Sequence, residues 1–185
     1  MASAFSHAVA GLAVGTAFWR PGAPPRFWVL GAVVAALPDV DAIAFRFGIA
    51  YGDMLGHRGL THSLVFAAAL SAAVVALAFP SGAAAVGRWQ LWLYFFLATA
   101  SHGVLDAFTN GGLGVAFFAP FDDARYFFPA RPIEVSPISV RAFFTARGAR
   151  VMASELVWIW APSIVFAAAM LWVRRRELTA GVVRG

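Results

Sequence analysis

The chain of 185 residues has no cysteine and few charged residues. The absence of cysteine excludes disulfide bonds and thiolate ligands, so any metal ion must be held by His, Asp or Glu. Charged residues make up 12% of the chain and hydrophobic residues 61%, whereas an average soluble domain has roughly 25% charged residues. This composition predicts an integral membrane protein, and the length suits one domain over residues 1–185.

Lysine is absent too, since all 14 basic residues are arginine, an absence from which no function is inferred. The net charge of +5 could indicate a nucleic-acid partner, but the arginines are scattered, so none is expected. Arg174, Arg175 and Arg176 follow an apolar segment, which indicates a membrane-topology signal or a contact with anionic lipid headgroups. The apolar N-terminus lacks the basic region of a signal peptide and is predicted to be a retained helix.

Several apolar segments are candidates for crossing a bilayer, whose core of about 30 Å requires about 20 residues of helix. They are residues 4–19, 27–37, 63–79, 89–108 and 156–173. The third and the fifth meet the length requirement, the fourth is long enough but holds polar groups, and Pro38 is expected to end the second. The first two would span by tilting, by thinning the bilayer or by packing. The predicted fold is all-α, an integral membrane bundle of about five helices.

Residues 109–154 form the longest polar connection, and they are rich in aromatic residues and proline. They are expected to form an ordered cap on the membrane surface, helical near 140–154. Alternating spans bring the histidines and Asp39, Asp41 and Asp106 to one end of the bundle. If the arginines near the C-terminus lie in the cytoplasm, that end faces outward.

His102 and Asp106 lie four residues apart in a predicted helix, so they share one face and can reach one metal ion or two neighbouring ions. The alternative is a polar pair that satisfies itself between packed helices. Asp39 and Asp41 follow Pro38 and are hard oxygen ligands at the mouth of the bundle, although Asp after Pro is also a common turn former.

The segment GHRGLTHS places His57 and His62 five residues apart, which a continuous helix would separate by roughly 140°. A helix break at Gly59 and a new start capped by Thr61 would let both face one centre; otherwise the segment is an interfacial loop. His7 alone suggests a packing residue. Its convergence with the other histidines and with three carboxylates predicts a metal site for zinc, manganese or iron.

These motifs together resemble a known family. HxxxG at residues 7–11, PDVD at 38–41, HRGLTHS at 57–63, SHGVLDAFTN at 101–110 and the later PFDDARYFFPARPIEVSP are similar to the YdjM-like, LexA-associated family of inner-membrane proteins, regarded as metal-dependent hydrolases. More distantly, the chain resembles the group of zinc-dependent phospholipase C and single-strand nucleases, whose zinc sites use an HxxxD helix.

The resemblance implies that His102 is a metal ligand and Asp106 a bridging ligand. It also implies further ligands, namely His7, one of Asp39 and Asp41, and His57 or His62. The chain lacks the N-terminal tryptophan ligand of the soluble enzymes and a later histidine pair with a glutamate, so one or two ions are expected.

The predicted function is a membrane-bound, multi-pass hydrolase of the plasma (inner) membrane that cleaves a phosphoester of a lipid or another amphiphile through metal-activated water. Asp39 or Asp41 would be the base, with Asp106 completing the catalytic carboxylates. Arg58, Arg125 and Arg131 are candidate phosphate contacts or, equally, headgroup anchors. The rivals are a metal or proton transporter that uses the same cluster and a structural protein; oligomeric state is left open.

Overall fold

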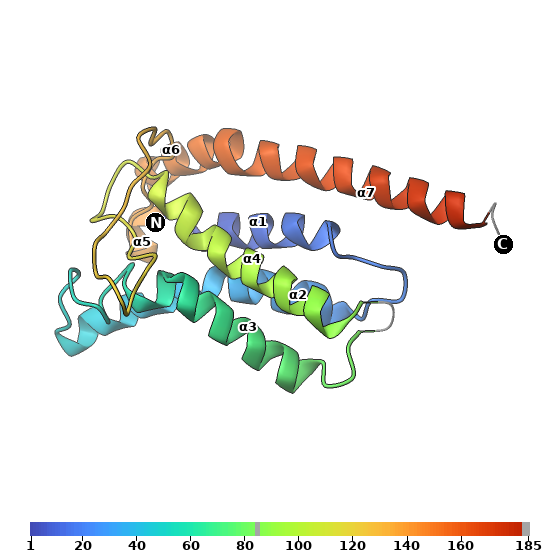
Figure 1. Ribbon diagram of the computed structural model, residues 1–185. Coiled ribbons are helices and arrows are strands. Elements are labelled where there is room, and N and C mark those ends of the chain that lie inside the picture. The colour runs from blue at the N-terminus through green and yellow to red at the C-terminus, as the bar shows by residue number, and fades with distance from the viewer. Residues whose placement is uncertain (84–85, 183–185) are drawn as a thin grey trace.

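The computed structural model describes residues 1–83 and 86–182, and over these residues the chain is helical with isolated β-bridges only. The helices are α1 (Ala4–Thr16), α2 (Pro25–Ala36), η1 (Leu37–Phe47), η2 (Leu60–His62), α3 (Leu64–Ala78), α4 (Arg88–Ala107), α5 (Val140–Phe143), α6 (Ala146–Glu155), η3 (Leu156–Trp160) and α7 (Ala161–Val182). Figure 1 shows α1, α2, α3, α4 and α7 running between two ends of the molecule. The N-terminus, α5 and α6 lie at one end and the C-terminus at the other.

The core between α1, α2, α3 and α4 contains large aromatic side chains together with small residues. Its buried members include Phe27, Val34, Ala35, Val75, Phe79, Leu91, Tyr94, Phe95 and Ala98. Gly31 allows the closest approach, because a Cβ there would overlap the Tyr94 hydroxyl. Gly11 likewise allows α1 to lie against α2, since its Cβ would lie 2.5 Å from that of Ala35. These contacts hold the helices that carry the polar cluster described below.

The lengths of the helices differ from those expected. Two helical stretches, Pro25–Phe47 with 23 residues and Ala146–Glu177 with 32, are long and apolar enough to cross a membrane. The α-helix α2 ends at Ala36, just before Pro38 as expected, but the chain continues directly into the 3-10 helix η1, so the helical stretch reaches Phe47. Pro38 lies in the first turn of η1, where its missing N–H is not required. By contrast, α3 has only 15 residues, bounded by the Ser63 cap and by the turn at 80–82.

The helix α7 lies along α1 and is exposed over most of its length (Figure 1). Ile164 and Val165 are 62% and 69% exposed. An apolar surface of this extent is unusual on a soluble protein and suits contact with lipid. The helix is continuous with η3 and α6, so residues 146–177 form one long helix.

Residues 109–139 cover the end of the bundle that holds the N-terminus, and they are mostly irregular. Backbone contacts tie them together, with isolated bridges between Thr109 and Ile133 and between Val115 and Tyr126. The expected helical stretch at 140–154 is present as α5 and α6. The expected single domain extends to residues 183–185, which lie outside the described residues.

Candidate metal centre

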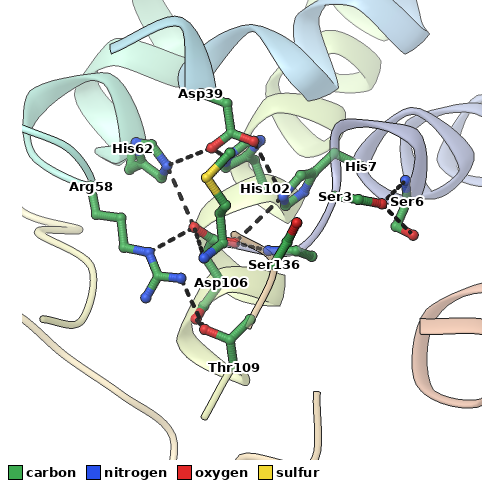
Figure 2. A network of polar contacts seen from close by, with 12 residues as sticks. Ser3, Ser6, His7, Asp39, Arg58, His62, His102, Asp106, Thr109 and Ser136 are labelled. Atoms are coloured by element: carbon green, nitrogen blue, oxygen red, sulfur yellow. Dashed lines mark hydrogen bonds and ion pairs between the residues drawn. The ribbon is translucent and has the colours of Figure 1, made fainter. Parts of the chain in front are cut away.

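The seven predicted metal-site residues meet at one end of the bundle. They are His7 from α1, Asp39 and Asp41 from η1, His57 from the following turns, His62 from η2, and His102 and Asp106 from α4. All four histidines and Asp106 are buried. Figure 2 shows Asp39, His62, His102, His7 and Asp106 pointing toward one another. The convergence expected from alternating helices is therefore present in the fold.

Two groups of these side chains could each hold a metal ion. In one group, Asp39, His62, His102 and Asp106 offer ligand atoms that all lie within 4.8 Å of one another. In the other, Asp41, His57 and His62 meet the same criterion. Asp39 and Asp41 separate because η1 turns about 120° per residue, so positions two apart point about 120° away from each other.

His102 has the clearest geometry for a metal ligand. Its Nδ1 lies 2.7 Å from the Ala35 carbonyl oxygen, which can only accept, so Nδ1 carries the proton. In the neutral ring, Nε2 then presents a lone pair to Asp39 Oδ1 at 3.2 Å. Two lone pairs face each other, and a proton or a metal cation must lie between them. A backbone carbonyl that fixes the tautomer in this way is typical of metal-binding histidines.

His7 lies on His102, with the ring centroids 3.6 Å apart and the planes inclined by 11°. Two protonated rings at this distance in a buried site would repel each other strongly, so protons alone satisfy the cluster poorly. His7 Nε2 lies 3.4 Å from Asp106 Oδ1 and 4.0 Å from Asp39 Oδ2. His7 thus joins the first group from the opposite side.

Several buried polar atoms of the cluster have no hydrogen-bond partner within the described part of the chain. They are both ring nitrogens of His7, Nε2 of His57 and His62, and one carboxylate oxygen each of Asp39 and Asp106. Buried polar groups are almost always satisfied, so this concentration of unsatisfied atoms requires an explanation. A divalent cation in the first group would satisfy Nε2 of His7 and of His62 and the Asp39 oxygen, whereas the Asp106 oxygen already lies beside the Arg58 guanidinium.

The Asp106 carboxylate is surrounded by charged and neutral donors. Its Oδ1 accepts a hydrogen bond from the Ala2 backbone N–H at 2.7 Å. Its Oδ2 lies 2.9 Å from Arg58 Nε and 3.6 Å from His62 Nε2. The Met1 amino group is 3.9 Å away. Asp106 therefore keeps a fixed orientation toward the histidines.

Asp41 is already fully engaged by the residues of the GHRGLTHS segment. Its Oδ1 lies 2.6 Å from His57 Nδ1, and its Oδ2 accepts hydrogen bonds from the Arg58 backbone N–H at 3.1 Å and from the Thr61 hydroxyl at 2.6 Å. A carboxylate placed behind a histidine in this way orients the ring and raises its basicity as a ligand. These contacts make Asp41 an orienting group for His57.

His62 stands between the two groups and just before α3. Burial by itself lowers the pKa of His62, but the carboxylates of Asp106 and Asp41 outweigh it and raise the pKa to about 9. The helix break expected at Gly59 is present, but Thr61 is not the cap of the next helix. Ser63 caps α3 instead, and the Thr61 hydroxyl donates to Asp41 Oδ2. His62 lies in the short helix η2, directly before Ser63.

The three predicted phosphate contacts have different surroundings. Arg58 is fully buried and adopts a positive φ of 63°, and its guanidinium donates to Gly111 O and Thr109 Oγ1, each at 2.9 Å, beside Asp106. Arg125 donates to backbone carbonyls of the loop, including that of His57 at 2.9 Å. These contacts favour structural roles for both.

Arg131 is exposed and lies over the Phe127 ring, 4.7 Å from its centroid. It has no recorded contact with the cluster among the described residues, so its role in binding phosphate stays a prediction.

Sequence reasoning missed a further buried carboxylate, which lies beside the first turn of α1. Glu155 is fully buried and accepts hydrogen bonds from Ser3 N at 2.5 Å, Ser3 Oγ at 2.6 Å and Ser6 Oγ at 2.7 Å. These bonds fix the first turn of α1, which carries His7. A lone glutamate directly before an apolar helix was the available signal, because such a charge needs a buried partner.

The fold and the cluster define a helical protein with long apolar helices and a buried His/Asp site able to hold a divalent metal. The chain matches the family of the YdjM inner membrane protein over residues 1–178 and belongs to that family. It is 39% identical over 182 residues to inner membrane protein YbcI of Escherichia coli (strain K12), covering 95% of this chain and all of that protein. No solved structure matches the chain.

Proposed function

We propose that this protein is a membrane-bound, metal-dependent hydrolase that cleaves a phosphoester in a lipid or another amphiphile. The observation that carries the proposal is the convergence of four ligand atoms from Asp39, His62, His102 and Asp106 within 4.8 Å of one another, beside buried nitrogens of His7 and His62 and an Asp39 oxygen that have no hydrogen-bond partner among the described residues. Nitrogen and oxygen ligands without sulfur suit zinc, and also manganese or iron.

The residues of the first group would hold the ion, namely Asp39, His62, His102 and Asp106, with His7 beside them. The second group would hold another ion only if His62 served both ions and Asp41 released one of its present partners. A divalent cation here would activate water and offset charge on a phosphoryl oxygen. Ala35 O and Asp41 would keep His102 and His57 in fixed orientations.

Asp39 is the stronger candidate for the catalytic base. Both oxygens of Asp41 are occupied by His57, Arg58 and Thr61, whereas Asp39 Oδ2 has no hydrogen-bond partner among the described residues. The Asp39 side chain is also 8% exposed, while those of His7, His62, His102 and Asp106 are 0% exposed. Substrate would therefore approach from the side of Asp39, whose carboxylate would accept a proton from water.

The surroundings of Asp39 favour an amphiphilic substrate. Val40 and Ile43 on the same helix are 59% and 52% exposed, so the helix that carries Asp39 also presents apolar surface. A substrate with a polar phosphoester and an apolar tail could place its tail there and its phosphoester at the cluster.

The proposed topology is multi-pass, with α1, α2–η1, α3, α4 and α6–η3–α7 crossing the inner membrane. The short helices α1 and α3 would cross by packing against their neighbours and thinning the bilayer locally. We propose that the end opposite the cluster, which carries Arg174–Arg176, Arg20, Arg26 and Arg88, lies in the cytoplasm and that the site faces outward. Reporter fusions at both termini test this, and a cytoplasmic N-terminus would contradict it.

The enzyme proposal is tested with detergent-purified protein, metal analysis and hydrolysis assays on phospholipid and nucleotide esters. Asp39→Asn and His102→Gln are compared with Asp123→Asn, which changes an exposed carboxylate of the cap. We expect the first two to lose both metal and hydrolysis and the control to keep both. Full hydrolysis by metal-free Asp39→Asn would overturn the proposal.

A further inference from the structure

An apolar groove lies between the N-terminal segment and α5. Its volume is about 380 Å³, and Phe5, Ile138, Phe143 and Phe144 form most of its wall. Ligand pockets commonly hold roughly 300–1,000 Å³, so this groove could take part of an extended apolar molecule. Phe5 is 62% exposed and Phe144 77%, so the described chain leaves these rings uncovered.

The helices next to the groove carry unpaired positive charge. Arg141 of α5 and Arg147 and Arg150 of α6 are exposed. None of the three side chains forms a hydrogen bond or an ion pair with any described residue. Glu155 is the only acidic residue of segment 140–155, and it is buried against Ser3 and Ser6. The surface beside the groove is therefore cationic.

Arg147 and Arg150 lie near the start of the long helix, at a position that corresponds to the level of lipid headgroups. Leu156, Val157 and Trp158 are 49%, 61% and 52% exposed and begin the apolar part of the helix. Arg150 precedes Leu156 by six residues, which is about 9 Å at about 1.5 Å per residue. With the apolar part in the hydrocarbon, the arginines and the groove lie at the interface.

We propose that this surface binds an anionic phospholipid, with an acyl chain in the groove and the phosphate on Arg147 and Arg150. The guanidinium fork matches phosphate oxygens, and the exposed phenylalanines match the chain. This inference goes beyond the proposed hydrolase, because the surface does not include any residue of the metal centre. A bound lipid here would fix the N-terminal segment at the depth where the metal centre lies.

The test measures lipid binding to the full-length chain in mild detergent by native mass spectrometry. The probes are phosphatidylglycerol and phosphatidylcholine with identical acyl chains, and a chelator is present so that metal and turnover play no part. We expect preferential binding of phosphatidylglycerol. The variant Arg147→Gln/Arg150→Gln should lower that affinity by roughly thirtyfold, because each arginine near anionic headgroups contributes about a fivefold factor.

Matched variants separate a specific site from general charge. Arg26→Gln/Arg46→Gln removes two exposed arginines outside α5 and α6, and should leave binding unchanged. Arg147→Lys/Arg150→Lys keeps the charge and should retain most of the binding, which would show that Arg147→Gln/Arg150→Gln acts through the lost charge. Ile138→Ser/Phe144→Ser should weaken binding of the long-chain lipid. Inorganic phosphate, which has no acyl chain, should not compete.

Other outcomes would overturn the proposal. Equal binding of the two lipids excludes an anionic headgroup site, and an equal loss in both glutamine variants shows a general charge effect. Competition by inorganic phosphate as strong as that by lipid would identify a free-anion site instead. A dimer that Phe144→Ser dissociates would show that a second copy of the chain covers the groove.

Discussion

Replacing Asp106 by asparagine removes one buried charge with little change of shape. The carboxylate accepts from Ala2 N at 2.7 Å and lies 2.9 Å from Nε of the fully buried Arg58. Without the Asp106 carboxylate, the Arg58 guanidinium keeps its hydrogen bonds to Thr109 and Gly111 but loses its ion-pair partner. Leaving one partner of a buried ion pair uncompensated costs roughly 3–5 kcal/mol.

The loss should be visible in thermal unfolding of the detergent-purified protein. At roughly 2–4 °C per kcal/mol for a chain of this size, Asp106→Asn should lower Tm by roughly 6–20 °C. The measurement uses circular dichroism with a chelator present, so that metal binding makes no contribution. Asp123→Asn, on the surface, should leave Tm unchanged.

A compensating variant separates the charge from the fold. Asp106→Asn/Arg58→Met removes both charges and should recover much of the lost stability, since an apolar pair replaces a buried ion pair at little cost. If Asp106→Asn alone unfolds at the wild-type temperature, the reasoning from the buried Arg58–Asp106 pair is refuted.

Other predictions concern metal, pH and packing. Chelation should lower the Tm of wild type but not of Asp39→Asn, because only a bound ion stabilises the fold by mass action. The raised pKa means that metal-free His62 holds a proton below about pH 9, so metal affinity should rise about tenfold per pH unit from pH 6.5 to 9; a flat titration contradicts this. Glu155→Ala leaves three donors without an acceptor and should cost at least about 3 kcal/mol in denaturant unfolding. Gly31→Ala forces Tyr94 to move and should cost roughly 1–3 kcal/mol by the same assay, and an unchanged midpoint would refute the close contact.

Local spacing predicted part of the site. His102 and Asp106 share a helix face because they are four residues apart, and both point into the cluster. The convergence of the distant histidines was predicted from the series of apolar segments, because helices that alternate in direction bring those residues to one end. The same reasoning could not distinguish Asp39 from Asp41. Their separation follows from η1 being helical, because a helix turns residues two apart toward different partners.

Other features depended on tertiary contacts that the sequence does not display. Arg58 has the chemistry of a phosphate ligand, yet the fold buries it against Asp106 and holds it at a positive φ. Glu155 lies 152 residues from Ser3, and no periodicity in the sequence connects them. The α-helix α2 ends just before Pro38, as a proline predicts, but the same residue also begins the 3-10 helix that presents Asp39. Each result reflects packing between segments far apart in the chain.

The central claim is that the His/Asp cluster holds a divalent metal ion. Its most direct test is metal analysis by inductively coupled plasma mass spectrometry of protein purified in mild detergent and desalted after incubation with zinc. We predict about one or two equivalents in wild type and in Asp123→Asn, and none in His102→Gln. A folded wild-type protein that retains no metal under these conditions would contradict the account.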